Sequence, residues 1–187
     1  MYVAKRSHKD KEGKLDTEPY HLTLLAKNYQ GYKNLMKMVS VAHLDGYYYK
    51  PRVDRELLKE FHEGVIALSG CAGGEFAESL KEGDFKVGEE IAKKYLEIFG
   101  EGNYFLELQD HEYTKILATA ELDPNVRQDM LVMEKFQKVW WDAVKTLSPK
   151  LGIPIVATND YHYVKSDDAE AQDAVLCVQT GKFIKDI

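Results

Sequence analysis

The stretch from Ile153 to His162 constrains the fold of this chain most, because an apolar run ends there in two potential ligands. Its opening letters, IPIV, show no polar alternation, which is typical of a parallel strand buried on both faces. Residues two apart in an extended chain project to one side, so Asp160 and His162 are predicted to point toward the same place. The pair favours a metal or catalytic site at the rim of an α/β barrel, and a cap of the following helix is the alternative.

Strand-like and helix-like segments alternate along the whole chain. After a strand end at residues 2–4, the predicted strands are residues 20–26, 64–70, 103–109 and 153–158. The predicted helices are residues 31–43, 55–61, 85–99, 129–147 and 166–178, and the predicted loops are residues 5–18, 46–52 and 112–128. Repeated strand–helix units imply parallel strands joined by helical crossovers. Four such units are too few to close a barrel, so we expect the C-terminal part of a larger, TIM-barrel-like α/β barrel.

The composition favours one soluble domain. A length of 187 residues is enough to bury a core, and a net charge of −6 argues against a protein that wraps nucleic acid over its whole surface. No apolar run approaches the roughly 20 residues of a membrane helix, so no membrane partner is expected. Two cysteines are too few for a disulfide framework, which favours a reducing, cytoplasmic location.

Potential ligands follow three of the predicted strands. Cys71 comes after the strand at 64–70, His111 after the strand at 103–109, and Asp160 after the last strand. If these strands are parallel, their carboxyl ends share one rim, where cysteine, histidine and aspartate suit zinc or a similar ion. Each residue also has a simpler interpretation, because a lone cysteine is commonly a small buried hydrophobe and His111 fits a surface loop. His21 lies near the start of its strand, so this argument does not place it on the rim.

The predicted loop at residues 46–52 combines tyrosines with cations. The loop contains Tyr48, Lys50 and Arg52. Aromatic and cationic side chains together bind single-stranded nucleic acid or phosphates, so these three residues are candidates for nucleic-acid contact. A loop whose tyrosines pack against the barrel is the alternative.

Four stretches of the sequence together resemble one family. They are residues 21–40, 46–58, 63–75 and 152–164, with the signatures LLAKN, KPR, LSGC and ATNDYHY. They are similar to the PHP (polymerase and histidinol phosphatase) domain of bacterial DNA polymerase III alpha subunits. The resemblance implies a distorted (β/α)7 barrel with a cleft for up to three metal ions.

The resemblance also implies a ligand set. The family's later metal ligands fall on His21, Cys71, Asp160 and His162, and His111 is a weaker candidate for a supporting position near the cleft. The expected cofactor is a divalent metal, zinc or manganese in this cleft, with magnesium serving the polymerase. The family's opening His-x-His motif has no counterpart here, so residues 1–187 are expected to be a partial PHP domain without polymerase domains.

Three functions follow from the resemblance. The first is a fragment of a DNA-directed DNA polymerase, a nucleotidyltransferase of DNA replication, whose PHP module supplies 3′–5′ exonuclease proofreading; this fragment alone is expected to be inactive. The second is a non-catalytic module that docks other subunits, and the third is a stand-alone phosphoesterase. The expected partners are DNA, a proofreading exonuclease subunit and a sliding clamp.

Overall fold

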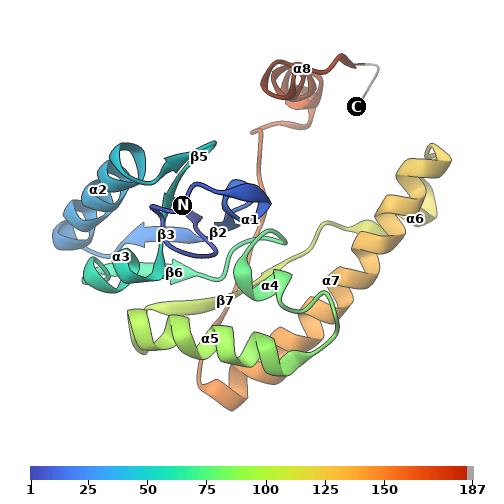
Figure 1. Ribbon diagram of the computed structural model, residues 1–187. Coiled ribbons are helices and arrows are strands. Elements are labelled where there is room, and N and C mark those ends of the chain that lie inside the picture. The colour runs from blue at the N-terminus through green and yellow to red at the C-terminus, as the bar shows by residue number, and fades with distance from the viewer. Residues whose placement is uncertain (185–187) are drawn as a thin grey trace.

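The computed structural model describes residues 1–184, which form an α/β fold with two four-stranded sheets (Figure 1). The strands are β1 (Tyr2–Val3), β2 (Tyr20–His21), β3 (Thr23–Ala26), β4 (Tyr47–Tyr48), β5 (Lys50–Val53), β6 (Val65–Leu68), β7 (Tyr104–Gln109) and β8 (Ile155–Thr158). The helices are α1 (Gly13–Thr17), α2 (Tyr29–Leu44), α3 (Arg55–Glu60), α4 (Glu75–Glu78), α5 (Phe85–Phe99), α6 (Tyr113–Thr119), α7 (Pro124–Leu151), the 3-10 turn η1 (Ser166–Asp168) and α8 (Ala169–Thr180). The predicted α/β class is confirmed.

The sheets combine parallel and antiparallel pairs. One sheet has the order β2-β1-β5-β4 and the other β3-β6-β7-β8. Strands β6, β7 and β8 are parallel, as expected, and so are β1 and β5. The pairs β1–β2, β3–β6 and β4–β5 are antiparallel, so the prediction of uniformly parallel strands is wrong. The β4–β5 hairpin reverses the chain between α2 and α3, so β6 runs antiparallel to β3.

Three predicted loops contain regular structure. Residues 5–18 include α1, residues 46–52 form the β4–β5 hairpin, and residues 112–128 hold α6 and the start of α7. Asp123 caps α7 by accepting a hydrogen bond from the Asn125 backbone, with Pro124 in the first turn, where its missing N–H costs nothing. Helix α5 lies where it was predicted, and α2 and α7 extend beyond their predicted ends.

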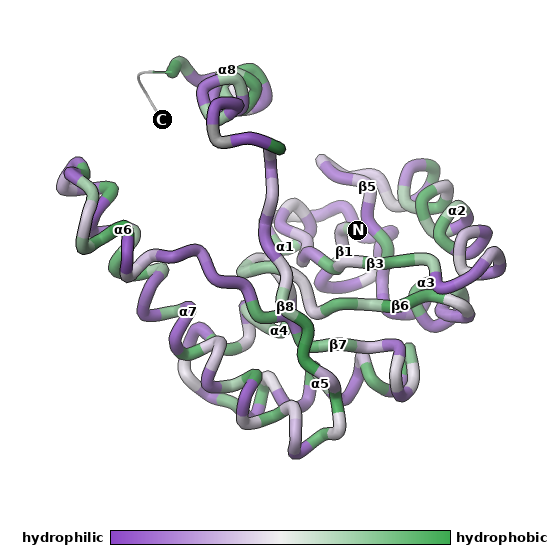
Figure 2. The backbone as a smooth tube through the Cα atoms, turned by 180° about the vertical axis from the view of Figure 1, so that it is seen from behind, coloured by the Kyte–Doolittle hydropathy of each residue, from purple (hydrophilic) through white to green (hydrophobic). Residues whose placement is uncertain are grey.

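The core lies where the sheets meet α2, α4, α5 and α7. Phe76, Tyr95, Tyr104 and Trp140 are each at most 2% exposed. Figure 2 shows hydrophobic residues concentrated along β6, β7 and β8. The prediction that the last strand is buried on both faces is wrong, because β8 is an edge strand among the described residues and Ile155 is 42% exposed.

The chain leaves the body after β8. Residues 159–165 form an extended connection to α8, which stands away from the sheets (Figure 1). Cys177 on α8 is buried. Among residues 1–184, no helix combines the length and the apolar character needed to cross a membrane.

Candidate metal-binding pocket

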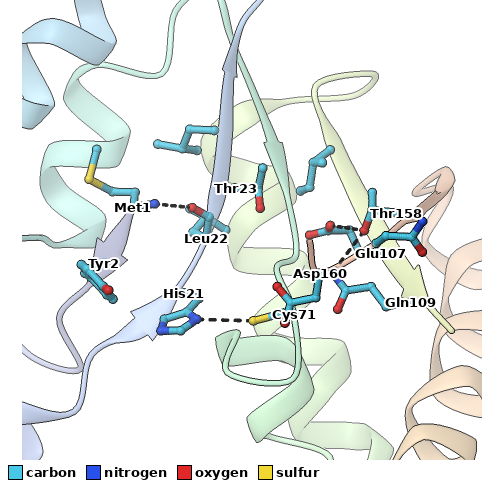
Figure 3. A pocket seen from close by; sticks show the side chains of 13 residues that line it. Met1, Tyr2, His21, Leu22, Thr23, Cys71, Glu107, Gln109, Thr158 and Asp160 are labelled. Atoms are coloured by element: carbon cyan, nitrogen blue, oxygen red, sulfur yellow. Dashed lines mark hydrogen bonds between the residues drawn. The ribbon is translucent and has the colours of Figure 1, made fainter. Parts of the chain in front are cut away.

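A pocket of about 550 Å³ opens where β3, β6, β7 and β8 meet at one rim (Figure 3). Its polar lining includes His21, Cys71, Glu107, Gln109, Thr158 and Asp160. The parallel strands β6, β7 and β8 supply residues at or beyond their carboxyl ends, as the sequence predicted. The strand ends therefore bring Cys71 and Asp160 to the same pocket.

His21 reaches this rim because β3 is antiparallel to β6. Thr23, the first residue of β3, pairs with Leu68, the last residue of β6. The start of one strand thus lies beside the end of the other, and His21 lies just before that start. Reasoning from strand ends missed this position because it assumed parallel pairing; only the family resemblance pointed to it.

His21 and Cys71 are in direct contact. The His21 Nδ1 atom lies 3.3 Å from the Cys71 Sγ atom (Figure 3). The loop after β6 packs against one side of the imidazole: the His21 amide donates to the Gly73 carbonyl at 2.9 Å, and a Cβ on Gly73 would lie 3.2 Å from His21 Nδ1. A side chain at residue 73 would therefore crowd the imidazole, so glycine suits this position.

Both members of this pair favour their neutral forms. Burial raises the pKa of the Cys71 thiol, and the Asp160 carboxylate raises it further. Burial lowers the pKa of His21. A neutral thiol beside a neutral imidazole is not an activated nucleophile, because cysteine chemistry needs the thiolate. The pair suits metal ligation, in which an arriving ion displaces the thiol proton, so affinity should increase with pH.

Glu107 connects the loop that carries Cys71 to the strand that leads to Asp160. This carboxylate is 2% exposed and accepts hydrogen bonds from the Gly70 amide and, at 2.6 Å, from the Thr158 hydroxyl. The Glu107 amide in turn donates to the Ser69 hydroxyl at 2.9 Å. Sequence reasoning missed Glu107 because the polar face of an alternating strand is commonly exposed to water. The available signal was its position two residues before Gln109, on the same face of a strand predicted to end at the rim.

Asp160 lines the pocket, whereas His162 does not. Asp160 acts electrostatically on both His21 and Cys71. His162 is exposed, is not among the residues that line this pocket, and its Nδ1 atom lies 2.9 Å from the Asp160 carbonyl. Across residues 1–184, no three histidine, cysteine or acidic side chains are grouped closely enough to hold an ion. The donor types fit a zinc-like ion, but only His21 and Cys71 are in contact.

His111 lies outside the pocket lining. Its backbone amide and its Nδ1 atom each lie 3.1 Å from the Gln137 side-chain oxygen on α7, and its ring stacks on Tyr113. The nearby polar group that does line the pocket is Gln109, whose amide nitrogen donates to Thr158 at 3.2 Å. Within the described residues, the Gln109 side-chain oxygen is buried without a hydrogen-bond partner.

The three residues proposed to contact nucleic acid differ in burial and surroundings. Arg52 is fully buried, and its guanidinium donates to the carbonyls of residues 8, 10, 16 and 46. It therefore holds the chain together and has no surface for nucleic acid, which corrects the prediction for this residue. Tyr48 is half-buried under the Arg52 guanidinium. The Lys50 ammonium lies 5.6 Å from the ring centre of Tyr2, which lines the pocket, and its charge acts on His21, so Lys50 lies near the edge of the pocket without lining it.

The chain is similar to known proteins over nearly its whole length. The family model of the PHP domain matches residues 1–111. A DNA polymerase III subunit alpha from Treponema pallidum (strain Nichols) is 42% identical over 97% of this chain. Proteins of the same name are 40% identical over 89% of the chain in Deinococcus radiodurans and 38% identical over 99% in Thermus aquaticus. The matched region is 14%, 11% and 14% of these relatives, respectively, so the chain spans about one seventh of their length or less.

Proposed function

The chain belongs to the PHP domain family, and we propose that it is part of the alpha subunit of a bacterial DNA polymerase III. The supporting observation is 42% identity over 97% of the chain to a protein of that name. The complete protein is then a DNA-directed DNA polymerase, a nucleotidyltransferase that acts in replication in the cytoplasm. Its partners are DNA, a proofreading exonuclease subunit and a sliding clamp, and nucleotidyl transfer belongs to the unmatched part of the relatives.

The pocket at the strand ends is the proposed metal site of this module. His21 and Cys71 provide the first two ligands, Asp160 the third, and His162 the fourth once the segment after β8 turns inward. Two imidazole nitrogens, a sulfur and a carboxylate favour zinc or manganese over magnesium. A bound divalent ion supplies a hydroxide near neutral pH and stabilises charge on a phosphoryl group.

The residues around the pocket have separate roles in this proposal. Glu107 fixes the Cys71 loop and β8 relative to each other through Gly70 and Thr158. Lys50, at the edge of the pocket, provides a cation for the phosphate backbone of DNA. Together these positions fit 3′–5′ hydrolysis of a DNA end, the proofreading activity proposed for this module.

A non-catalytic docking role is the second candidate. The observation that favours it is the outward position of His162, which leaves the proposed ligand set incomplete in the described structure. In that role the pocket residues stabilise the module, which binds other subunits without hydrolysing DNA. A stand-alone phosphoesterase is the least favoured function, because the full-length similarity is to polymerase subunits.

Primer extension tests the assignment to a polymerase. The purified 187-residue chain with magnesium should not extend a primed template, whereas the complete subunit that contains it should. Extension by the chain alone, or failure of the complete subunit, would contradict the proposal. Incubating the complete subunit with a 3′-labelled primer and manganese or zinc separates the two roles. Release of the label that disappears in Asp160→Ala supports hydrolysis, and no release despite bound metal supports docking.

A further inference from the structure

Helix α2 has one buried face and one exposed face of unusual composition. Gly31, Asn34, Met38 and Ala42 are buried on the inner face, against β3 and β5. The approach is close: a Cβ on Gly31 would lie 1.7 Å from the Gly64 carbonyl oxygen, so only glycine fits there. This packing fixes which side of the helix points outward.

The outward side carries an apolar ridge. It consists of Tyr29, Tyr32, Met36 and Val39, which are 70%, 52%, 45% and 45% exposed. Figure 2 shows hydrophobic residues along much of α2. An outer helix of an α/β fold normally presents polar side chains to water. The ridge therefore has no explanation in the packing of this fold.

Helix α5 is a comparison for α2, because its outer face is exposed to solvent. Its exposed side chains are mostly charged, and Lys93 and Lys150 form salt bridges with Glu89 at 2.7 and 2.6 Å. The single strongly exposed apolar residue on α5 is Val87, which is 45% exposed. The α2 ridge, in contrast, is continuous from Tyr29 to Val39, over almost three turns of the helix.

The spacing of the ridge matches a helix-packing seam. Its residues are separated by three, four and three positions, and His43 follows four positions later. Alternating steps of three and four place side chains along a line that a second helix can pack against. From Tyr29 to His43 this line is about 21 Å long at 1.5 Å per residue.

The charges beside the ridge indicate the charge that a partner would carry. Lys33 and Lys37 lie next to it, and residues 29–44 contain no aspartate or glutamate. The two ammonium groups lie over the rings of Tyr29 and Phe61, at 4.7 and 5.4 Å from the ring centres. Within residues 1–184, neither lysine forms an ion pair with a carboxylate. The surroundings are thus locally basic on a chain whose net charge is −6.

We propose that the α2 ridge binds an amphipathic helix of another protein, with an apolar stripe flanked by acidic residues. The stripe packs against Tyr32, Met36 and their neighbours, and the acidic flanks meet Lys33 and Lys37. Single-stranded nucleic acid is the competing ligand, because exposed tyrosines can stack on bases. Met36 and Val39 favour the helix, since aliphatic side chains extend the ridge without offering a stacking surface.

Peptide binding tests this proposal on the 187-residue chain. Three labelled peptides of equal length are compared by fluorescence anisotropy: an amphipathic helix with leucine at the seam positions and glutamate flanks, the same helix with lysine flanks, and a scrambled acidic version. Only the first should bind well. The double variant Tyr32→Ala/Met36→Ala should weaken its binding about tenfold or more. Lys33→Glu/Lys37→Glu should weaken binding and reverse its salt dependence, because added salt then screens a repulsion between the new carboxylates and the acidic flanks.

Val87→Ala on α5 is the matched control, because its side chain is as exposed as Met36. It should bind the acidic helix like the wild type, and a melting curve verifies that each variant folds. Equal binding of the acidic and scrambled peptides, or wild-type binding by the ridge variants, would overturn the proposal. Two further results would also overturn the proposal. One is binding of oligothymidine that depends on Tyr32 while the acidic helix does not bind. The other is a wild-type dimer that the substitution Met36→Glu dissociates.

Discussion

The two sides of the pocket differ in how firmly the fold positions them. The side with His21 and Cys71 lies beside the paired strands β3 and β6, where strand pairing and a backbone hydrogen bond to Gly73 hold His21 in place. The side with Asp160 and His162 lies on the extended segment after β8, with His162 exposed. The fold itself therefore builds half of the proposed site, whereas the other half depends on an exposed segment outside the sheets and helices.

Glu107→Ala is predicted to have the largest effect, because Glu107 joins the two sides. Its loss leaves the buried Gly70 amide and Thr158 hydroxyl without their acceptor, which costs about 2–4 kcal/mol in the free energy of unfolding. Urea unfolding of this variant measures the cost. Glu97→Ala on the exposed face of α5 is the control and should change stability by about 0.5 kcal/mol or less. Equal stability of the two variants would show that Glu107 does not join the two sides.

Acid should weaken the sheet that contains His21 through Asp54, which directly follows β5 of that sheet. Burial alone raises the pKa of Asp54, but hydrogen bonds from the His8 amide, the His8 ring and the Leu57 amide outweigh it, so its pKa is lowered on folding. Because the pKa of Asp54 is lower in the folded state than in the unfolded chain, the ionised carboxylate stabilises the folded state at pH values above the unfolded pKa of about 3.9. This stabilisation is lost as the pH falls through the lower pKa of the folded state.

Thermal melts between neutral pH and pH 3 test this linkage. The wild type should lose stability below about pH 4, and Asp54→Asn, which keeps a capping oxygen for α3, should lose less of its own stability over the same range. Parallel acid profiles for the two proteins would show that Asp54 is not the group responsible.

A smaller effect is predicted to distinguish Asp160 from His162. If the segment after β8 keeps its described position, Asp160→Ala should weaken zinc binding about tenfold, and His162→Ala should leave it nearly unchanged. Isothermal titration gives both affinities. A loss in His162→Ala as large as that in Asp160→Ala would show that the segment turns inward when metal binds, and that the two sides close on each other.

The sequence predicted the strand ends of the pocket better than its interior. Cys71 and Asp160 could be placed because apolar runs precede them and parallel strands share a rim. His21 could not be placed from strand ends, since its position depends on the antiparallel pairing of β3 with β6, and that pairing depends on a hairpin predicted as a loop. Arg52 was assigned to the surface because nothing in its neighbours reveals that four backbone carbonyls bury its guanidinium.

Glu107 and the helices in residues 112–128 are further features that the sequence pattern could not predict. The role of Glu107 depends on a loop and a strand that are far away in sequence, so a pattern within β7 cannot reveal it. The start of α7 has weak apolar periodicity because the helix extends beyond the core there, and its cap at Asp123 was the available signal. His111 was placed near the pocket by its strand, but its contact with α7 decides its orientation.

Cobalt titration tests the central claim most directly, namely that the fold presents His21 and Cys71 together as metal ligands. A cobalt–thiolate bond produces a charge-transfer absorption that other ligands do not give. The account predicts this absorption in the wild type and in Cys177→Ser, its disappearance in Cys71→Ser, and its reversal when zinc is added. An unchanged absorption in Cys71→Ser, or no absorption in either the wild type or Cys177→Ser, would contradict the account.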